Sequence, residues 1–311
     1  MPTSLAINYT ASSRCVGYNK IIKAERPQNE NNWPLNVRSM FIFLAAIIVV
    51  LFLADQAGAW GVATHVELTR MVLGDLAGLS SGLAGLILAH RREFISGNIM
   101  ADVIMGKKFS RRRRRSHHWP AAKRLLDRAE DDRGRAFAYG FMTHLAADTV
   151  AHNHYIPELI RSTGSTVAMG HLYWEMRLDQ LVRPEYRMLT VQLLRVREAR
   201  LKPLFAEHVY PQLMWFGLNQ SVFARVHRFA NGQGFARAVG ICQDLSRWQL
   251  ASDAFTDYRD QARERMIDLV RNGSESKVTH EDPNGHAALR LLKRQKPLWR
   301  NPPAALPCGN Q

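Results

Sequence analysis

Residues 136–157 read AFAYGFMTHLAADTVAHNHYIP, an apolar, helix-forming run that carries His144, Asp148, His152 and His154. An α-helix turns about 100° per residue, so His144 and Asp148, four residues apart, lie one above the other on one face. Imidazole nitrogen and carboxylate oxygen are both zinc ligands, and a helix presents two of them at this spacing without strain. The stretch therefore predicts a helix with a metal-binding face.

A second pair with the same spacing, His171 and Glu175, follows in GHLYWEMRL. Two such pairs with a histidine between them indicate a metal cluster rather than isolated buried histidines. The chain has three cysteines and no Cys-x-x-Cys, so nitrogen and oxygen must hold the metal. Further candidate ligands lie upstream: His65 in WGVATHVELT, Asp102 in SGNIMADVIMGKK, and His117 and His118 in SHHWPAA.

Taken in order, these residues resemble the bacterial zinc-dependent phospholipase C family. The resemblance covers residues 60–175 and implies an all-α, multi-helix zinc-dependent phospholipase C-like domain. The matching pattern is Trp60-Gly-x-x-x-His65, Asp102, His117-x-Trp119, His144-x-x-x-Asp148-x-x-x-x-x-His154 and His171-x-x-x-Glu175.

The resemblance also implies a ligand set for about three zinc ions per chain. It assigns Asp102 to a place beside the bridging water, as a ligand or as the catalytic general base. Trp60 and His65 would hold one ion and His117 and His144 a second, with Asp148 bridging these two, while His154, His171 and Glu175 would hold the third.

Two positions in this set have a competing neighbour. Bare helical periodicity favours His152 over His154; we name His154 because the family spacing does, and because Pro157 predicts that the helix ends near that point. His118 competes with His117, and we name His117 because Ser-His-x-Trp matches the family motif.

The function implied by the resemblance is hydrolysis of a phospholipid, in which a metal-bound hydroxide releases the phosphorylated headgroup. An alternative is a zinc-dependent single-strand nuclease, which uses the same zinc constellation. Such nucleases normally end the last pair in Asp where this chain has Glu175, and their His-Phe-x-Gly-Asp helix is not matched by HLAAD at residues 144–148. A third possibility is a non-catalytic, zinc-stabilised protein of a membrane surface.

The charge balance favours an anionic partner. Lys and Arg number 42 against 27 Asp and Glu, and an excess of 13 remains when residues 1–59 are set aside. Such a field attracts phospholipid surfaces, or nucleic acid under the nuclease alternative. The run Arg111 to Arg115 lies between two candidate site residues, where we expect it to steer phosphate headgroups or dock the protein on an anionic membrane. We expect a monomer with phospholipid as its substrate.

Residues 1–59 have the pattern of a leader with a signal peptide. The apolar run FIFLAAIIVVLFLA at residues 41–54 has the length of a signal-peptide h-region, and Ala57-Gly58-Ala59 has the A-x-A form of a cleavage site. We expect cleavage after Ala59 and export to the periplasm or medium; without cleavage the segment would anchor the protein in a membrane. The polar stretch before the h-region leaves Met40 as an alternative start.

The remaining chain divides in two. Residues 60–272 carry apolar side chains at three- and four-residue spacing and predict the all-α zinc phosphodiesterase domain. Within it we expect a helix from Ser80 that ends at Gly97 and Asn98. Residues 273–311 shift to Gly, Ser, Asn, Pro and charge, so we expect a partly disordered basic tail with one short helix in HAALRLLKRQK.

Overall fold

The computed structural model describes residues 60–78, 82–102, 117–163, 167–194, 213–232, 234, 235, 237, 239, 240, 248 and 252–294. These residues form helices and no β-strand, so the predicted all-α class is confirmed. No helix among them is long and apolar enough to cross a membrane. The leader with its h-region, the arginine run at 111–115, and the three cysteines lie outside the described residues.

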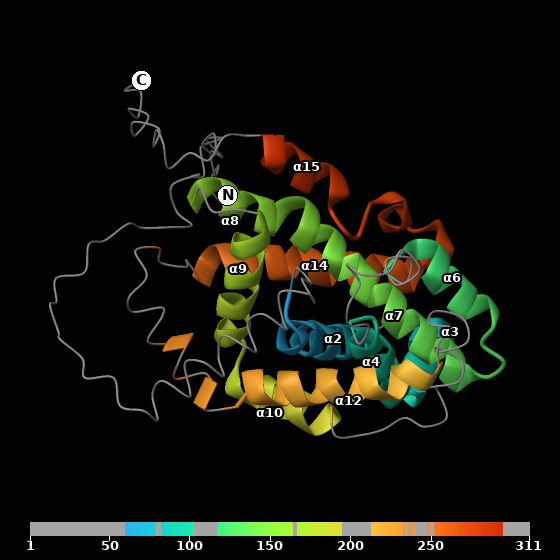
Figure 1. Cartoon of the computed structure of the whole chain (residues 1–311). Coiled ribbons are helices and arrows are strands. Elements are labelled where there is room, and N and C mark those ends of the chain that lie inside the picture. Colours follow the sequence, from blue (N-terminus) through green and yellow to red (C-terminus); the bar gives the residue numbers. More distant parts are fainter. Residues whose placement is uncertain are drawn as a thin grey trace, which may run out of the picture.

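The helices pack around α2, which runs through the middle of the molecule (Figure 1). All side chains in the N-terminal half of α2, from Val62 to Thr69, are buried, as expected where a helix has neighbours on every side. In chain order the elements are α2 (Val62–Leu76), α3 (Gly82–Ala89), α4 (Arg91–Met100), α6 (Trp119–Asp127), α7 (Asp132–Val150), the π-helix η2 (Ala151–Tyr155), α8 (Ile156–Thr163), α9 (Val167–Leu181), α10 (Pro184–Leu193), α12 (Leu213–Ala230), α14 (Ser252–Asn272), the 3₁₀ turns η3 (Gly273–Glu275) and η4 (Lys277–His280), and α15 (His286–Arg294).

Two glycines let α4 and α7 approach closely. A Cβ at Gly97 would overlap the carbonyl oxygen of Phe137, and a Cβ at Gly140 would overlap that of Phe94. Backbone contact of this kind requires residues without a side chain. The expected end of this helix at Gly97 and Asn98 is wrong: because Gly97 packs against α7, α4 continues through it to Met100. The same packing brings Asp102, just beyond α4, toward α7.

The helix of residues 136–157 does not end near Pro157 as expected. It passes without a break from α7 through η2 into α8, where Pro157 is the second residue. Proline lacks an N–H and its ring collides with the carbonyl four residues back in an α-helix. The wider turn of η2, in which the Ile156 N–H reaches the Ala151 carbonyl five residues back, realigns the hydrogen bonds just before the proline.

The C-terminal part of the described chain returns to α7 and η2. Two hydrogen bonds fasten residues 281–285, which lie between η4 and α15. Asn153 of η2 donates through Nδ2 to the Asp282 carbonyl at 2.9 Å, and Trp119 of the neighbouring α6 donates through Nε1 to the Glu281 carbonyl at 2.7 Å. Residues 273–294 of the expected tail thus form η3, η4 and α15, and α15 falls in the segment HAALRLLKRQK. Residues 295–311 lie outside the described residues.

Candidate metal centre

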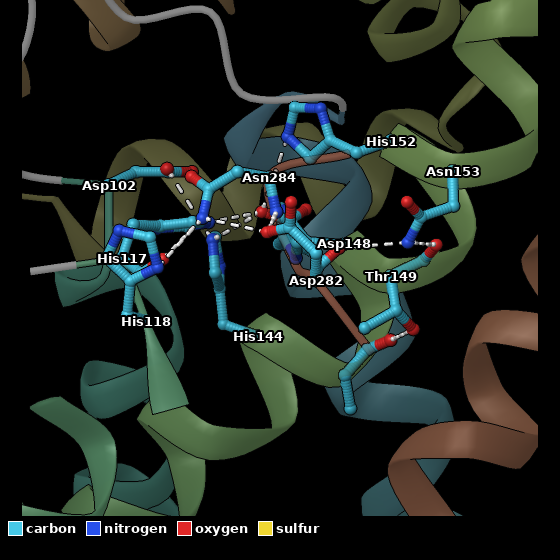
Figure 2. A network of polar contacts seen from close by, with 12 residues as sticks. Asp102, His117, His118, His144, Asp148, Thr149, His152, Asn153, Asp282 and Asn284 are labelled. Carbon is cyan, nitrogen blue, oxygen red and sulfur yellow. Dashed lines mark hydrogen bonds and ion pairs between the residues drawn. The ribbon is translucent and has the colours of Figure 1, made fainter. Parts of the chain in front are cut away.

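Asp148 lies at the centre of a buried cluster of histidines (Figure 2). Its Oδ2 is 2.6 Å from Nε2 of His117 and 3.4 Å from Nε2 of His144, and its Oδ1 is 3.2 Å from Nε2 of His65. A fourth histidine, His152, brings its Nε2 to 3.8 Å from Oδ2. Four imidazoles thus surround one carboxylate that is fully shielded from solvent.

Asp102 extends this cluster on the side of His144. Its Oδ1 lies 3.5 Å from Nε2 of His144, whose ring stacks on that of His65 with centroids 3.9 Å apart. Two triads result, each with ligand atoms within 4.8 Å of one another: His65, Asp102 and His144, and His117, His144 and Asp148. Because both contain His144, the two candidate metal positions are neighbours.

The cluster is assembled from separate elements of the chain. His65 comes from the first turn of α2, Asp102 follows α4, and His117 precedes α6. His144 and Asp148 share one face of α7, as their spacing predicts. The site therefore depends on the packing of α2 and α4 against α7 and not on any single helix.

Each charged group of the cluster shifts the pKa of its neighbours in the direction that keeps the neighbour charged. Burial alone would lower the pKa of His144, but the carboxylates of Asp102 and Asp148 outweigh it and raise the pKa to about 9. Burial alone would raise the pKa of Asp148, yet the charge of His144 and the hydrogen bond with His117 hold that pKa well below its usual range. The centre is thus built for positive charge beside an ionised carboxylate.

The residues fit a metal ion. Within the described residues, neither ring nitrogen of His65 or of His144 makes a hydrogen bond of acceptable geometry, although both side chains are almost fully buried. Buried polar atoms normally have a partner. Imidazole nitrogens and carboxylate oxygens at this separation, without thiolate, are the donor set of a zinc centre.

His117 and not His118 lies in the cluster. The backbone carbonyl of His117 accepts a hydrogen bond of 2.7 Å from Nδ2 of Asn284. The half-buried imidazole of His118 instead lies with its Nδ1 3.4 Å from Nδ2 of Asn284 and stacks on the ring of His286, with centroids 6.3 Å apart. No pattern in the sequence indicates that Asn284, in the expected tail, contacts this residue. Long-range contacts of this kind leave no local pattern in a sequence.

His154, which the resemblance assigns to a third ion with His171 and Glu175, lies outside the Asp148 cluster. His154 is exposed, and the charged groups near it are Arg265 and Glu281. His152 occupies the place near Asp148 instead, as bare helical periodicity favoured. The physical reason is that the helix continues past residue 154, so the family spacing points this side chain away from the acidic centre.

The other predicted ligands lie around the cluster. Trp60 is fully buried, with its indole ring 6.5 Å from that of His65 between ring centroids. Glu175 is buried on α9 and lines a pocket with Gly61 of the α2 entry. His171 belongs to the same helix, but its side chain lies outside what the structure describes.

Two further residues of this region were not singled out from the sequence. Asp179 lies one helical turn beyond Glu175. It accepts hydrogen bonds from the backbone N–H of Thr64 at 3.1 Å and from the Thr64 hydroxyl at 2.8 Å. Because Thr64 is the third residue of α2, these bonds cap the first turn of that helix. His227 of α12 is buried in the pocket that Glu175 lines, and burial lowers its pKa to about 4 against the opposing charge of Asp102.

Comparison with known proteins agrees with the geometry. Residues 64–214 match the family model described as zinc dependent phospholipase C. The matched segment includes His65, the Asp148 cluster and α9. Neither the curated proteins nor the solved structures that were compared gave a match. Residues 64–214 therefore form a domain of the zinc-dependent phospholipase C family, and its buried histidines and aspartates form a possible metal site.

Proposed function

We propose that this protein is an exported zinc-dependent phospholipase C, which hydrolyses a phospholipid and releases the phosphorylated headgroup. The observation that carries the proposal is the buried convergence of four histidines on Asp148, with Asp102 beside them. A purely structural cluster would satisfy its ring nitrogens with hydrogen bonds, whereas within the described residues those of His65 and His144 make none. Membership of the family supplies the reaction type.

The ligands proposed here are His65, His117, His144 and Asp148, with Asp102 at the edge of the cluster and His152 beside Asp148 as an outer-shell partner. Bound zinc supplies a lowered pKa for a coordinated water and draws charge from the phosphoryl oxygens. The protein's own residues hold and orient the ions, and Asp148, placed between three histidines, keeps the positions close together.

Asp102 is the proposed general base. It is the carboxylate of the cluster that retains some exposure to solvent, whereas Asp148 has none. A carboxylate beside a dication stays ionised and can accept a proton from water. It lies just beyond α4, close to His144 but away from Asp148 at the middle of the cluster, and this position suits a side chain that contacts the substrate.

The test uses purified protein with dispersed phospholipid. We expect headgroup release that a chelator abolishes and added zinc restores, while single-stranded nucleic acid is left intact. The Asp102→Asn variant should lose most hydrolysis but keep most of its zinc. The matched control is Asp132→Asn, a surface carboxylate that pairs with Arg135 at 3.3 Å and should change neither. Nucleic acid cleavage without headgroup release would overturn the proposal.

The proposal extends to location and membrane contact. Cleavage after Ala59 would leave Trp60 as the first residue, beside His65, and its free α-amine could then act as a ligand. The arginines at 111–115 would attract the anionic membrane that holds the substrate. Mass measurement of the exported protein's N-terminus, and salt-dependent binding to anionic vesicles, test these two points.

A further inference from the structure

His227 is a buried histidine that the family pattern does not include. It lies on α12, beyond the segment that matches the family model, and 5 % of its surface is exposed. Its ring packs on that of Phe223, with centroids 4.2 Å apart. Within the described residues its Nε2 has no hydrogen-bond partner, which is unusual for a buried polar atom.

The pocket beside His227 contains a buried carboxylate. It is lined by Gly61 at the entry of α2, by Glu175 of α9, and by His227 and Phe235 from the chain after α10. The pocket adjoins the metal centre, since the carboxylate of Asp102 lies close enough to His227 for their charges to interact. A neutral imidazole and a carboxylate facing one pocket are the beginnings of a metal site.

The pocket also contains the carboxylate of Asp179. It accepts hydrogen bonds from the backbone and hydroxyl of Thr64, and these bonds hold the N-terminal turn of α2. The resemblance groups Glu175 with His154 and His171 on a third ion. The His154 side chain is exposed beside Arg265 and Glu281, and the side chain of His171 lies outside what the structure describes.

We propose that His227 and Glu175 together hold a divalent cation, zinc by preference, so that an imidazole from α12 takes the ligand position expected of His154. The inference rests on the proposed zinc centre and names one of its ligands. It makes α12, of which the family match covers only the first two residues, part of the metal-binding machinery. His227 carries the ligand atom, and Glu175 supplies the negative charge that offsets the cation.

The experiment counts metal. Purified wild-type protein and four variants are equilibrated in the same zinc buffer, and bound zinc per chain is measured by mass spectrometry of the elements. His227→Gln should hold one equivalent less than wild type, because an amide is a poor zinc ligand. His227→Cys should recover that equivalent, since thiolate is a zinc ligand. His154→Gln should match wild type.

The fourth variant, Phe235→Leu, is the packing control. It changes the wall of the same pocket without removing a ligand atom and should keep the wild-type zinc count. Circular dichroism shows whether each variant is folded. A folded His227→Gln variant with the full zinc count, or a His154→Gln variant that loses one equivalent, overturns the inference.

The result separates this inference from the proposed function. Loss of one zinc by His227→Gln in a protein that releases no headgroup upholds the site and refutes the activity. Full zinc retention by His227→Gln in a protein that does release headgroup refutes the site and upholds the activity. Wild-type protein that binds no zinc overturns both.

Discussion

The end of α7 and the π-helix η2 follow one another in a single continuous helix (Figure 1), yet different contacts hold their side chains in place. His144 and Asp148 in α7 are fixed by the core, because α4 and α14 cover the helix on both sides. The η2 turn is partly exposed and is held by residues 281–285, which lie about 130 positions later in the chain. One half of the site thus depends on packing within the helical core, and the other depends on its attachment to residues 281–285.

The contacts to η2 are specific. Asn153 bonds to the Asp282 backbone, and Gly285 passes so close to η2 that a Cβ there would overlap the carbonyl oxygen of His152. Arg265 of α14 completes the attachment by contacting both Glu281 and the hydroxyl of Thr149. Figure 2 shows the His152 ring directed toward Asp148 while Asn153 turns toward Asp282. We therefore expect substitutions that affect α7 and substitutions that affect η2 to change zinc binding and stability to different extents.

The largest effect is expected in the half held by the core. Asp148→Ala removes the carboxylate that three histidines share, so metal binding should fall well beyond the roughly 10- to 100-fold that the loss of an outer-shell partner costs. Zinc titration monitored by competition with a chromophoric chelator measures the change. Zinc affinity within a factor of a few of wild type would remove the basis of the proposed centre.

The next effect concerns the attachment of η2. Gly285→Ala should lower the free energy of unfolding by more than the roughly 1–2 kcal/mol that a left-handed backbone costs a residue with a Cβ, because φ is +59° and the Cβ also meets the His152 carbonyl. Gly273→Ala is the matched control, since its φ is +57° but its nearest neighbour, the Tyr139 hydroxyl, is 3.8 Å away.

Urea denaturation of the two variants gives the comparison directly. Gly285→Ala should be the less stable of the two and should also bind zinc more weakly, while Gly273→Ala should keep its zinc affinity. Equal stabilities would show that residues 281–285 yield to the added methyl group, and that η2 does not depend on them.

A third test compares the two histidines of η2. His152→Ala should weaken zinc binding by about 10- to 100-fold, the cost of removing a group that supports a metal centre. His154→Ala should leave zinc binding and hydrolysis unchanged, because its side chain is exposed. Calorimetric titration with zinc distinguishes them. The reverse order of effects would restore the family spacing and refute the placement of His152.

The smallest effect is expected from Asn284. Its Nδ2 donates to the His117 carbonyl, so Asn284→Ala should cost about 1 kcal/mol of stability, the usual value of one hydrogen bond. Because the bond positions His117, zinc affinity should fall with it. Asn272→Ala removes an exposed hydrogen bond to Asp268 and is the control. A loss of stability with unchanged zinc affinity would limit Asn284 to a structural role.

Prediction from the sequence succeeded where geometry is local. The spacing of His144 and Asp148 alone places both on one face of α7, and the structure has them there. The helical class followed from apolar spacing, and it was confirmed. The expected end of a helix at Gly97 was wrong, because a glycine that ends a helix and one that lets two helices touch look the same in a sequence.

By itself, then, the sequence determined the all-α class, the family, and the ordered set of histidines and carboxylates that the site draws on. Only the tertiary structure decided which of two neighbouring histidines faces Asp148 and how the continuous helix passes Pro157. It also decided that His227 lines a pocket with Glu175 and that Asn284 contacts His117. The reason is physical. Helical periodicity is set by hydrogen bonds between residues four apart, whereas these outcomes depend on packing between segments far apart in the chain, which no local pattern encodes.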